Sequence, residues 1–419
     1  MQRFVGVIGI VILLLIAYGL SNNRKKINYK TVGTALLLQI LLALFIFKVP
    51  LGQYIFIKIG AFVEKLMDFA MAGGNVAFNG ILGNKFTADY CSGTKIFAFQ
   101  LICSMILMIV LVNILYYYGI MQKVVAFLGK WMNKLMKVSG AEALCAVANS
   151  FVGNVTAQIM IKPYLKDFTM SELLTSMAGS LACVSGAMMP VYIKMGVPAV
   201  YILASSIMAA PGAIVIAKIM YPETEEPKTG EDVKIEVKRT HVNLIDSIAA
   251  GAGDGMKVAI NITAMIIALV SLVAMIDWFL GGFGSLLYYH CHLNWSWLPA
   301  LSLKFILGKI FAIFALIMGV PLQDITNVGG LIGEKLVLNE VVAYLDLTSI
   351  KAALTAKSFL IASFALCSFG NIGSIAIQIG GIGELAPTQR GNLAKLGVKA
   401  LIAGTLTCFM SATIVGIMF

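Results

Sequence analysis

The sequence predicts an all-α polytopic membrane protein with about eight transmembrane helices, two re-entrant hairpins and additional helices along the membrane interface. Hydrophobic residues make up 59% of the 419 residues and charged residues only 12%, whereas a soluble protein has about 25% charged residues. Several apolar segments are long enough to cross a bilayer, and others are interrupted near their middle. These observations exclude an ordinary water-soluble protein.

The N-terminal apolar segment, residues 4–20, is long enough to span a bilayer and is followed by four basic residues between positions 24 and 30. Basic residues favour the cytoplasmic side, so this order predicts an uncleaved helix with its N-terminus outside rather than a signal peptide. Residues 31–49 then return across the membrane. Further apolar segments lie at residues 96–119, 197–220, 258–280, 305–320 (short for a full crossing) and 396–418.

Two charged stretches lie outside the spanning segments. Lys123, Lys130, Lys134 and Lys137 alternate with apolar residues, a pattern that favours a helix lying along the membrane interface. Residues 222–241 hold six of the chain's twenty acidic residues and predict a solvated linker between two halves. Only fourteen acidic residues (20 minus 6) serve the rest of the chain, so a carboxylate inside an apolar segment is exceptional.

These segments divide the chain into five expected parts. Residues 1–138 hold N-terminal scaffold and interfacial helices, and residues 139–221 a first repeat with a re-entrant hairpin, a broken helix and a spanning helix. Residues 222–257 form the charged linker and an amphipathic helix. Residues 258–320 hold another scaffold helix and the apolar segments after it, and residues 321–419 form a second repeat.

Charge and cysteine usage argue against several other classes of protein. The net charge of +11 fits loops on an anionic cytoplasmic leaflet, because the basic clusters interleaved with aromatics that bind nucleic acid are absent. The seven cysteines include no C-x-x-C pair and resemble small buried hydrophobic residues. His290, Cys291 and His292 fit a polar loop better than a metal site. No nucleophile-and-base set or phosphate-binding loop occurs, so neither an enzyme nor an organic cofactor is expected.

Two pairs of interrupted segments share one layout, an interrupted apolar stretch followed by a helix broken near its middle. The four segments are residues 141–165, 171–191, 325–347 and 352–379. Gly153 lies 30 residues before Cys183, and Glu340 lies 31 residues before Asn371, which indicates a duplicated unit. Irregular backbone at membrane depth is tolerated where it lines a cavity, so the paired interruptions favour a transporter built from inverted repeats.

Polar residues mark the interruptions of the second pair. Glu340 follows Asn339 within an apolar run, and a carboxylate there is expected to bind a ligand, pair with a base or carry a proton. The alternative is a static pair with Lys335, five residues back and poorly aligned on a helix face. Asn371 and Ser374 share a helix face, so with Glu340 they suit a neutral polyhydroxyl ligand. Polar contacts between helices are the alternative for this motif.

The interruption of the first pair is polar but uncharged. Residues 149–158 read N-S-F-V-G-N-V-T-A-Q. An unwound turn there would offer an amide oxygen and backbone carbonyls to a small hard cation. A helix-packing turn without a ligand is the alternative.

At these residues the sequence resembles the concentrative nucleoside transporter family, most closely from Gly319 onward. Residues 319–321 read G-V-P, residues 330–335 read G-L-I-G-E-K and residues 339–344 read N-E-V-V-A-Y, similar to family motifs in the same order. Further similar runs are residues 364–367, 370–375, 378–383, 385–387, 401–406 and 410–414. Weaker similarity at residues 97–100 and 161–165 extends the resemblance over most of the chain.

The resemblance implies a secondary-active nucleoside carrier in a bacterial inner membrane, with eight membrane helices, two re-entrant hairpins and a homotrimeric assembly. A transport domain is expected to move like an elevator against a fixed scaffold. Glu340, Asn371 and Ser374 match the family residues that hold the ribose, and Phe369 matches an aromatic beside the nucleoside. The positions that match base contacts are Gly153, Asn154, Val155 and Thr156.

The resemblance also implies a sodium site. Asn149 and the Val152 carbonyl match family sodium ligands, and the carbonyls of Cys183 and Val184 are further candidates. However, Cys183 stands where sodium-coupled members have a serine, and sulfur is a soft ligand that suits an alkali cation poorly. The family also has proton-coupled members, so both Na⁺ and H⁺ stay open as the coupling ion.

The first hairpin differs from the family at its tip. Where the family commonly reads G-Q-T-E-A-P, residues 153–158 read G-N-V-T-A-Q, so Thr156 replaces the usual glutamate. We expect ribose recognition to be kept and base preference to be changed. Two alternatives stay open: a divergent carrier for another ribosylated or polyol solute, and a membrane receptor that binds its ligand without moving it.

Overall fold

The structure, a computed structural model, describes residues 2–78, 97–229, 242–289, 295 and 297–419. Within these residues the chain is helical and contains no strand, which confirms the all-α fold class. Five of the described helices are long and apolar enough to cross a membrane. They are Tyr29–Phe47, Phe97–Tyr117, Ala199–Met220, Leu244–Tyr289 and Pro387–Met418, with shorter apolar helices at Val5–Gly19, Ala356–Leu366 and Ile372–Leu385.

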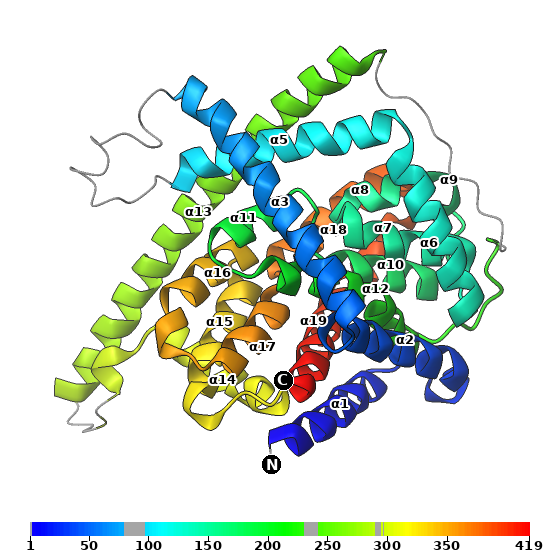
Figure 1. Cartoon of the computed structure of the whole chain (residues 1–419). Coiled ribbons are helices and arrows are strands. Elements are labelled where there is room, and N and C mark those ends of the chain that lie inside the picture. The colour runs from blue at the N-terminus through cyan, green and yellow to red at the C-terminus, as the bar shows by residue number, and fades with distance from the viewer. Residues whose placement is uncertain (1, 79–96, 230–241, 290–294, 296) are drawn as a thin grey trace.

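The N-terminal helices α1 (Gln2–Gly19) and α2 (Tyr29–Phe47) pack against the long apolar helices of the core. The Oδ1 atom of Asn28 caps α2 by accepting hydrogen bonds from the next turn. Pro50 then begins α3 (Pro50–Ala77), which runs diagonally across the front of the molecule in Figure 1. The hydropathy pattern does not predict α3 as an element, because charged residues interrupt its apolar surface.

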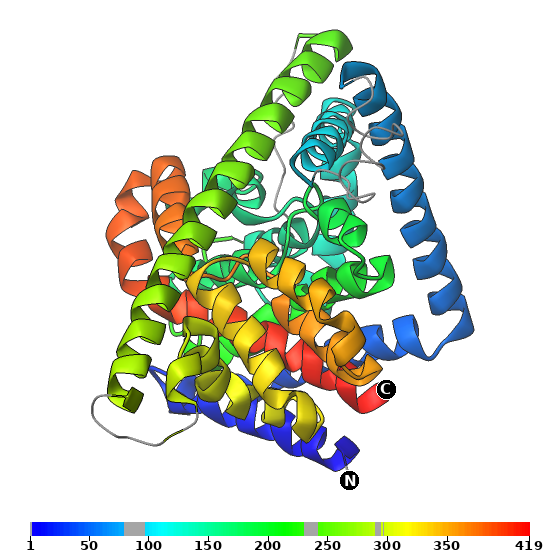
Figure 2. The same cartoon turned by 90° about the vertical axis from the view of Figure 1, so that its left-hand side faces the viewer.

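Helix α13 (Leu244–Tyr289) is one continuous helix of 46 residues. It passes without a break through residues 257 and 258, where the sequence suggests a boundary between an amphipathic helix and a scaffold helix. It packs along α5 (Phe97–Tyr117), and the two cross at glycines: a Cβ atom on Gly255 would lie 2.6 Å from the Cα atom of Ile106. In Figure 2, α13 forms the near edge of the molecule.

Helix α6 (Ile120–Met136) coincides with the amphipathic segment predicted from its lysines. Gly129 faces α7, where a Cβ atom on it would lie 3.0 Å from the Cα atom of Leu144. The opposite side carries the exposed lysines together with Phe127 and Trp131, which are 65% and 61% exposed. Lysines beside large exposed aromatics are typical of a helix at a membrane interface.

The two predicted repeats form the centre of the molecule (Figure 1). The first consists of α7 (Gly140–Phe151), α8 (Asn154–Ile159), α9 (Lys162–Leu165), α10 (Met170–Ala182), α11 (Met189–Lys194) and α12 (Ala199–Met220). The second consists of α15 (Ile325–Val337), α16 (Glu340–Ser349), α17 (Ala356–Leu366), α18 (Ile372–Leu385) and α19 (Arg390–Met418), and α14 (Leu303–Ile317) packs along α15. All four interruptions fall where the sequence predicts them.

The breaks in the two broken helices contact each other. The backbone N–H of Phe369, between α17 and α18, donates a 3.1 Å hydrogen bond to the carbonyl of Cys183, between α10 and α11. Near this contact the Gln378 side chain donates to Ser180 at 2.8 Å. Helix α19 lies beside both breaks, since its Cys408 thiol donates to the Ala182 carbonyl at 3.3 Å. Backbone groups freed by the breaks are thus partly paired with the opposite repeat.

Candidate substrate and ion site

The second hairpin turns at Leu338 and Asn339, and this turn places Glu340 at the start of α16. Asn339 caps the helix, because its Oδ1 atom accepts a 3.0 Å hydrogen bond from the backbone N–H of Val342. Glu340 is 3% exposed, and its Oε1 atom accepts a 2.9 Å hydrogen bond from the Tyr192 hydroxyl of α11. Its Oε2 atom has no hydrogen-bond partner in the described part of the chain. This carboxylate therefore keeps a free acceptor inside the protein.

Lys335 does not form the static pair considered from the sequence. It is fully buried on the last turn of α15, and its Nζ atom has no hydrogen-bond partner among the described residues. Glu340 instead accepts its hydrogen bond from Tyr192. Unpaired buried charges are unfavourable by on the order of several kcal/mol each, so both side chains call for a functional explanation.

Asn371 and Ser374 lie together at the start of α18, as their spacing predicts. The Oδ1 atom of Asn371 caps the helix by accepting from the backbone N–H of Ser374 at 2.9 Å and from its hydroxyl at 3.0 Å. The amide nitrogen of Asn371 makes no hydrogen bond among the described residues and can donate to a ligand. Phe369 is half-buried just before this cap.

The first hairpin turns at Gly153, which has φ +73°. A Cβ atom there would lie 2.6 Å from the Cα atom of Ser185, so only glycine fits against the break that follows α10. Thr156, two residues into α8 from its start, is exposed. Asn154 and Val155 are part of α8, and their side chains are outside the described structure.

Each hairpin tip lies against the broken helix of the other repeat. Helix α8 of the first hairpin packs on α18. Glu340 and Tyr344 of the second hairpin contact Tyr192 of α11, whose ring centre lies 4.6 Å from that of Tyr344. This reciprocal arrangement gathers polar groups from both repeats around the two breaks, which is where inverted-repeat transporters bind their substrates.

The candidate cation ligands lie at the end of α7 and in the break after α10. Asn149 is fully buried, and its Nδ2 atom donates to the Ser176 carbonyl at 3.4 Å while its Oδ1 atom has no partner among the described residues. Val152 ends α7, and Cys183 and Val184 are fully buried in the break after α10. A free amide oxygen and non-helical carbonyls are oxygen donors of the kind that suit Na⁺.

The Cys183 thiol is a poor candidate ligand in this setting. Its sulfur lies 4.0 Å from the Ser150 hydroxyl and 3.8 Å from the Ser206 carbonyl. Any cation held here would depend on the oxygen atoms around it. The cluster of His290, Cys291 and His292 lies outside the described residues, and the described residues contain no group of three or more His, Cys, Asp or Glu side chains suited to a metal ion.

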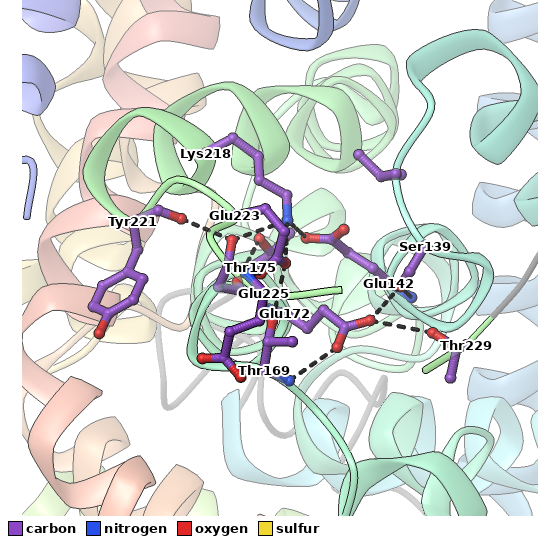
Figure 3. A network of polar contacts seen from close by, with 12 residues as sticks. Ser139, Glu142, Thr169, Glu172, Thr175, Lys218, Tyr221, Glu223, Glu225 and Thr229 are labelled. Atoms are coloured by element: carbon purple, nitrogen blue, oxygen red, sulfur yellow. Dashed lines mark hydrogen bonds and ion pairs between the residues drawn. The ribbon is translucent and has the colours of Figure 1, made fainter. Parts of the chain in front are cut away.

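Composition alone suggests that Glu340 is an exceptional buried acid, but the structure buries others. The further acidic residues with little exposure are Glu142, Glu172, Asp324 and Glu334. Lys218 of α12 forms an ion pair with Glu142 at 2.8 Å (Figure 3). Glu334 pairs with Lys304 at 3.1 Å, and Asp324 accepts hydrogen bonds from Thr355 and Ser358. Among these acids, Glu340 is distinguished by an oxygen without a hydrogen bond on a carboxylate that forms no ion pair with the described residues, a property that sequence does not reveal.

The start of the linker is solvated only in part: residues 224–228 are exposed, as predicted, but polar contacts attach its two ends to the first repeat. Figure 3 shows Glu172, which caps α10 together with Thr169, accepting hydrogen bonds from Ser139 at 2.5 Å and from Thr229 at 3.1 Å. Thr229 is buried, and Glu223 lies 3.5 Å from Lys218. The linker up to residue 229 is thus joined to the first repeat by buried polar contacts, and residues 230–241 lie outside the described part.

Two residues that contribute to the site were missed by the sequence analysis. Tyr192 orients the Glu340 carboxylate, and Gln158 accepts hydrogen bonds from the Ser176 hydroxyl at 2.6 Å and the Cys145 thiol at 2.9 Å. The signal for Gln158 was its polarity inside an apolar run. For Tyr192 no sequence signal distinguishes it from other aromatic residues of the apolar segments.

The geometry defines a membrane transporter, in which the hairpins and broken helices of two repeats meet inside a bundle of apolar helices. Three family models match the sequence: Na⁺ dependent nucleoside transporter N-terminus over residues 8–81, Nucleoside recognition over residues 98–199, and Na⁺ dependent nucleoside transporter C-terminus over residues 201–416. The chain therefore belongs to the Na⁺ dependent nucleoside transporter family, and it is not an enzyme.

Relatives of known name or structure match the chain over nearly its whole length. It is 40% identical to an uncharacterized transporter of Haemophilus influenzae, over 98% of this chain and 96% of the relative. It is 35% identical to the nucleoside permease NupC of Helicobacter pylori, again over 98% and 96%. Its structure resembles that of CNTnw in an inward-facing substrate-bound state, with a TM-score of 0.92 at 36% identity over 100% and 98% of the two chains. This agrees with the family expected from the sequence motifs.

Proposed function

We propose that this chain is a secondary-active carrier that brings nucleosides into the cell together with a cation. The observation that carries this proposal is the free Oε2 atom of Glu340, a buried carboxylate oxygen without a partner at the meeting point of the two repeats. A ribose hydroxyl is a neutral donor that satisfies such an acceptor without adding charge. Membership of the nucleoside transporter family supports this choice of ligand.

The ribose in this proposal is held by the second repeat. Glu340 accepts from a hydroxyl group, the free amide nitrogen of Asn371 donates to another, and the Ser374 hydroxyl lies beside the same cap. Phe369 is half-buried next to Asn371 and offers its ring to the nucleoside. These side chains come from the tip of one hairpin and the break of one helix, so a change in either element alters the affinity for ribose.

The base in this proposal is read by the tip of the first hairpin, residues 153–156. Gly153 keeps the turn compact, and Thr156 is exposed and offers a short neutral hydroxyl. Asn154 and Val155 complete the tip in sequence. A short hydroxyl reaches fewer atoms of a base than a glutamate does, so the contacts to the base are fewer and preference between bases is weaker or different.

The coupling ion in this proposal is Na⁺, held by the Oδ1 atom of Asn149 and by the carbonyls of Val152, Cys183 and Val184. Ion binding at this position would stabilise the first hairpin against the break after α10, so ion and substrate would raise each other's affinity. Proton coupling is the alternative, and Glu340 is then the group that carries the proton.

Transport assays with separate ion gradients test the proposal. Purified protein is reconstituted in liposomes, and uptake of radiolabelled uridine and adenosine is measured under an inward Na⁺ gradient, under an inward H⁺ gradient and under neither. We expect accumulation above equilibrium under the Na⁺ gradient. Saturable binding of nucleoside without accumulation under either gradient would contradict a carrier and support a receptor. Competition by ribose or polyols but not by nucleosides would indicate a different solute.

The assembly in this proposal is a homotrimer in the bacterial inner membrane, with the two repeats moving against a fixed scaffold. Helix α13 supports a lateral partner, because most of its surface is exposed and apolar along 46 residues. Mass photometry or native mass spectrometry of the detergent-solubilised protein measures the assembly directly. A monomeric mass of a protein active in transport would exclude the trimer.

A further inference from the structure

Lys335 and Glu340 are two buried side chains of opposite charge with unpaired atoms in the same hairpin. Lys335 is 0% exposed at the end of α15, and its Nζ atom has no hydrogen-bond partner in the described part of the chain. Glu340 is 3% exposed at the start of α16, and its Oε2 atom has none either. Five positions and one tight turn separate them, and the acid next to Lys335 in sequence, Glu334, is already paired with Lys304 at 3.1 Å.

Lys218 is a second buried lysine, and its contacts differ from those of Lys335. Among the described lysines only Lys218 and Lys335 are buried. Lys218 forms ion pairs with Glu142 at 2.8 Å and with Glu223 at 3.5 Å (Figure 3). Lys218 thus contacts two carboxylates, whereas Lys335 forms no ion pair with the described residues. The difference indicates that Lys335 has a partner in only part of the transport cycle.

The surroundings of Lys335 leave Glu340 as its natural partner. Glu340, Cys367 and Cys408 are the titratable groups near enough to interact with the Lys335 ammonium, and thiols are weak acceptors. The helix itself is held in place, since a Cβ atom on Gly333 would lie 2.3 Å from the Cβ atom of Leu307 on α14. The flexible four-carbon stem of the lysine is therefore the part that can move.

We infer that Lys335 is a positioning residue for transport, whose ammonium pairs with the Glu340 carboxylate in the substrate-free carrier and releases it when a nucleoside hydroxyl binds there. Tyr192 holds the carboxylate by its other oxygen in the released arrangement. The inference rests on the proposed function. Its consequence is specific: without Lys335, the empty carrier must cross the low-dielectric interior with an uncompensated carboxylate.

The test compares net uptake with exchange in proteoliposomes that contain the full chain. Net uptake of radiolabelled uridine under an ion gradient requires the empty carrier to return, whereas exchange against internal unlabelled uridine does not. We expect Lys335→Met to lower net uptake about tenfold or more while exchange stays within about twofold of the wild type. Lys335→Arg keeps the charge and restores part of the net uptake. Lys395→Met, at an exposed position of α19, serves as the control and changes neither rate.

Equal loss of net uptake and exchange in folded Lys335→Met would overturn the inference, as would no loss of either. Exchange by the wild type tests the proposed function separately, because it does not depend on any Lys335 variant. If Lys335→Met does not reconstitute, melting temperatures of substrate-free protein in detergent decide. We expect Lys335→Met to lower the melting temperature less in a Glu340→Gln background than in the wild type. Equal decreases in both backgrounds would show that the two side chains do not interact.

Discussion

The two repeats share one layout but differ in whether the polar side chains near their hairpins are paired. In the first repeat the polar side chains near the hairpin are largely bonded to each other: Gln158 to Ser176 and Cys145, and Lys218 to Glu142. At the tip of the second hairpin, Glu340 has an unpaired atom, as does Lys335 at the end of α15. The two copies of one architecture therefore differ: polar side chains are mostly paired within the first copy, whereas the second leaves polar atoms unpaired.

The free amide oxygen of Asn149 is the exception in the first repeat. It is buried and has no partner among the described residues, and the non-helical residues after α7 and α10 offer backbone carbonyls to the same proposed ion. An acceptor without a donor suits a cation, whereas the second repeat offers both acceptor and donor groups and suits a hydroxylated solute. In the proposed function the ion and the ribose therefore bind to different copies of the repeat, and each prediction below tests one side of this comparison.

The largest effect is expected from Glu340→Gln. The amide replaces one acceptor oxygen by a donor group, so a ribose hydroxyl loses its strongest contact, and we expect uptake to fall by at least about 100-fold. Proteoliposome uptake of uridine measures this. Glu384→Gln, an exposed carboxylate at the end of α18, is the matched control. Normal uptake by Glu340→Gln would remove the ribose from this position.

Lys218→Met tests cohesion in the first repeat. The change leaves Glu142 buried at 1% exposure without its ion-pair partner, which destabilises the fold by roughly 3–5 kcal/mol. We expect a large decrease in melting temperature in detergent, measured by intrinsic fluorescence. Lys228→Met breaks the exposed pair with Asp167 and is expected to have little effect. Similar melting of both variants would show that burial of the Lys218 pair contributes no cohesion.

Gln158→Ala tests the hydrogen bonds within the first hairpin. The Ser176 hydroxyl and the Cys145 thiol then lose their acceptor in a buried environment, and we expect destabilisation of about 1–3 kcal/mol. Thermal unfolding monitors it, with Thr156→Ala, two residues away and exposed, as the control. A melting temperature equal to that of the control would mean that Gln158 acts at the ligand rather than in packing.

Thr156→Glu tests whether the first hairpin reads the base. The substitution returns the acidic side chain that the family commonly has at this position, and we expect the ratio of uridine to adenosine uptake to change by about tenfold. Inhibition by ribose is expected to stay the same, because the ribose contacts lie in the second repeat. A parallel change for both nucleosides would indicate that the hairpin tip affects movement rather than recognition.

The smallest effect is expected from Cys183→Ser. A hydroxyl oxygen adds a hard ligand beside the carbonyls of the break, so the Na⁺ concentration for half-maximal uptake should fall by about threefold. Titration of uridine uptake against Na⁺ measures the change, and Cys103→Ser on α5, also buried, is the control. An unchanged Na⁺ dependence would place the ion away from the break after α10.

Sequence alone predicted much of this architecture because hydropathy and interruptions are local properties. The turns at Gly153 and Leu338 and the breaks after Ala182 and Leu366 fall within the predicted segments, and the cap at Asn371 with Ser374 follows from their spacing. The long helix α3 was not predicted, because charges at its surface hide its apolar character. The continuity of α13 through residue 257 was not predicted either, because composition changes there while the backbone does not.

The sequence by itself determined the fold class, the duplicated repeats and the family, because the low charge content, the repeated interruptions and the linked motifs can be recognised without knowledge of tertiary contacts. Tertiary structure decided which buried charges are paired. Glu142 and Glu340 are both carboxylates within helical segments, but the tertiary packing places Lys218 beside Glu142 and Tyr192 beside Glu340. Pairing depends on contacts between residues far apart in the chain, 76 positions for Lys218 with Glu142 (218 minus 142) and 148 for Tyr192 with Glu340. Local sequence patterns do not predict such contacts.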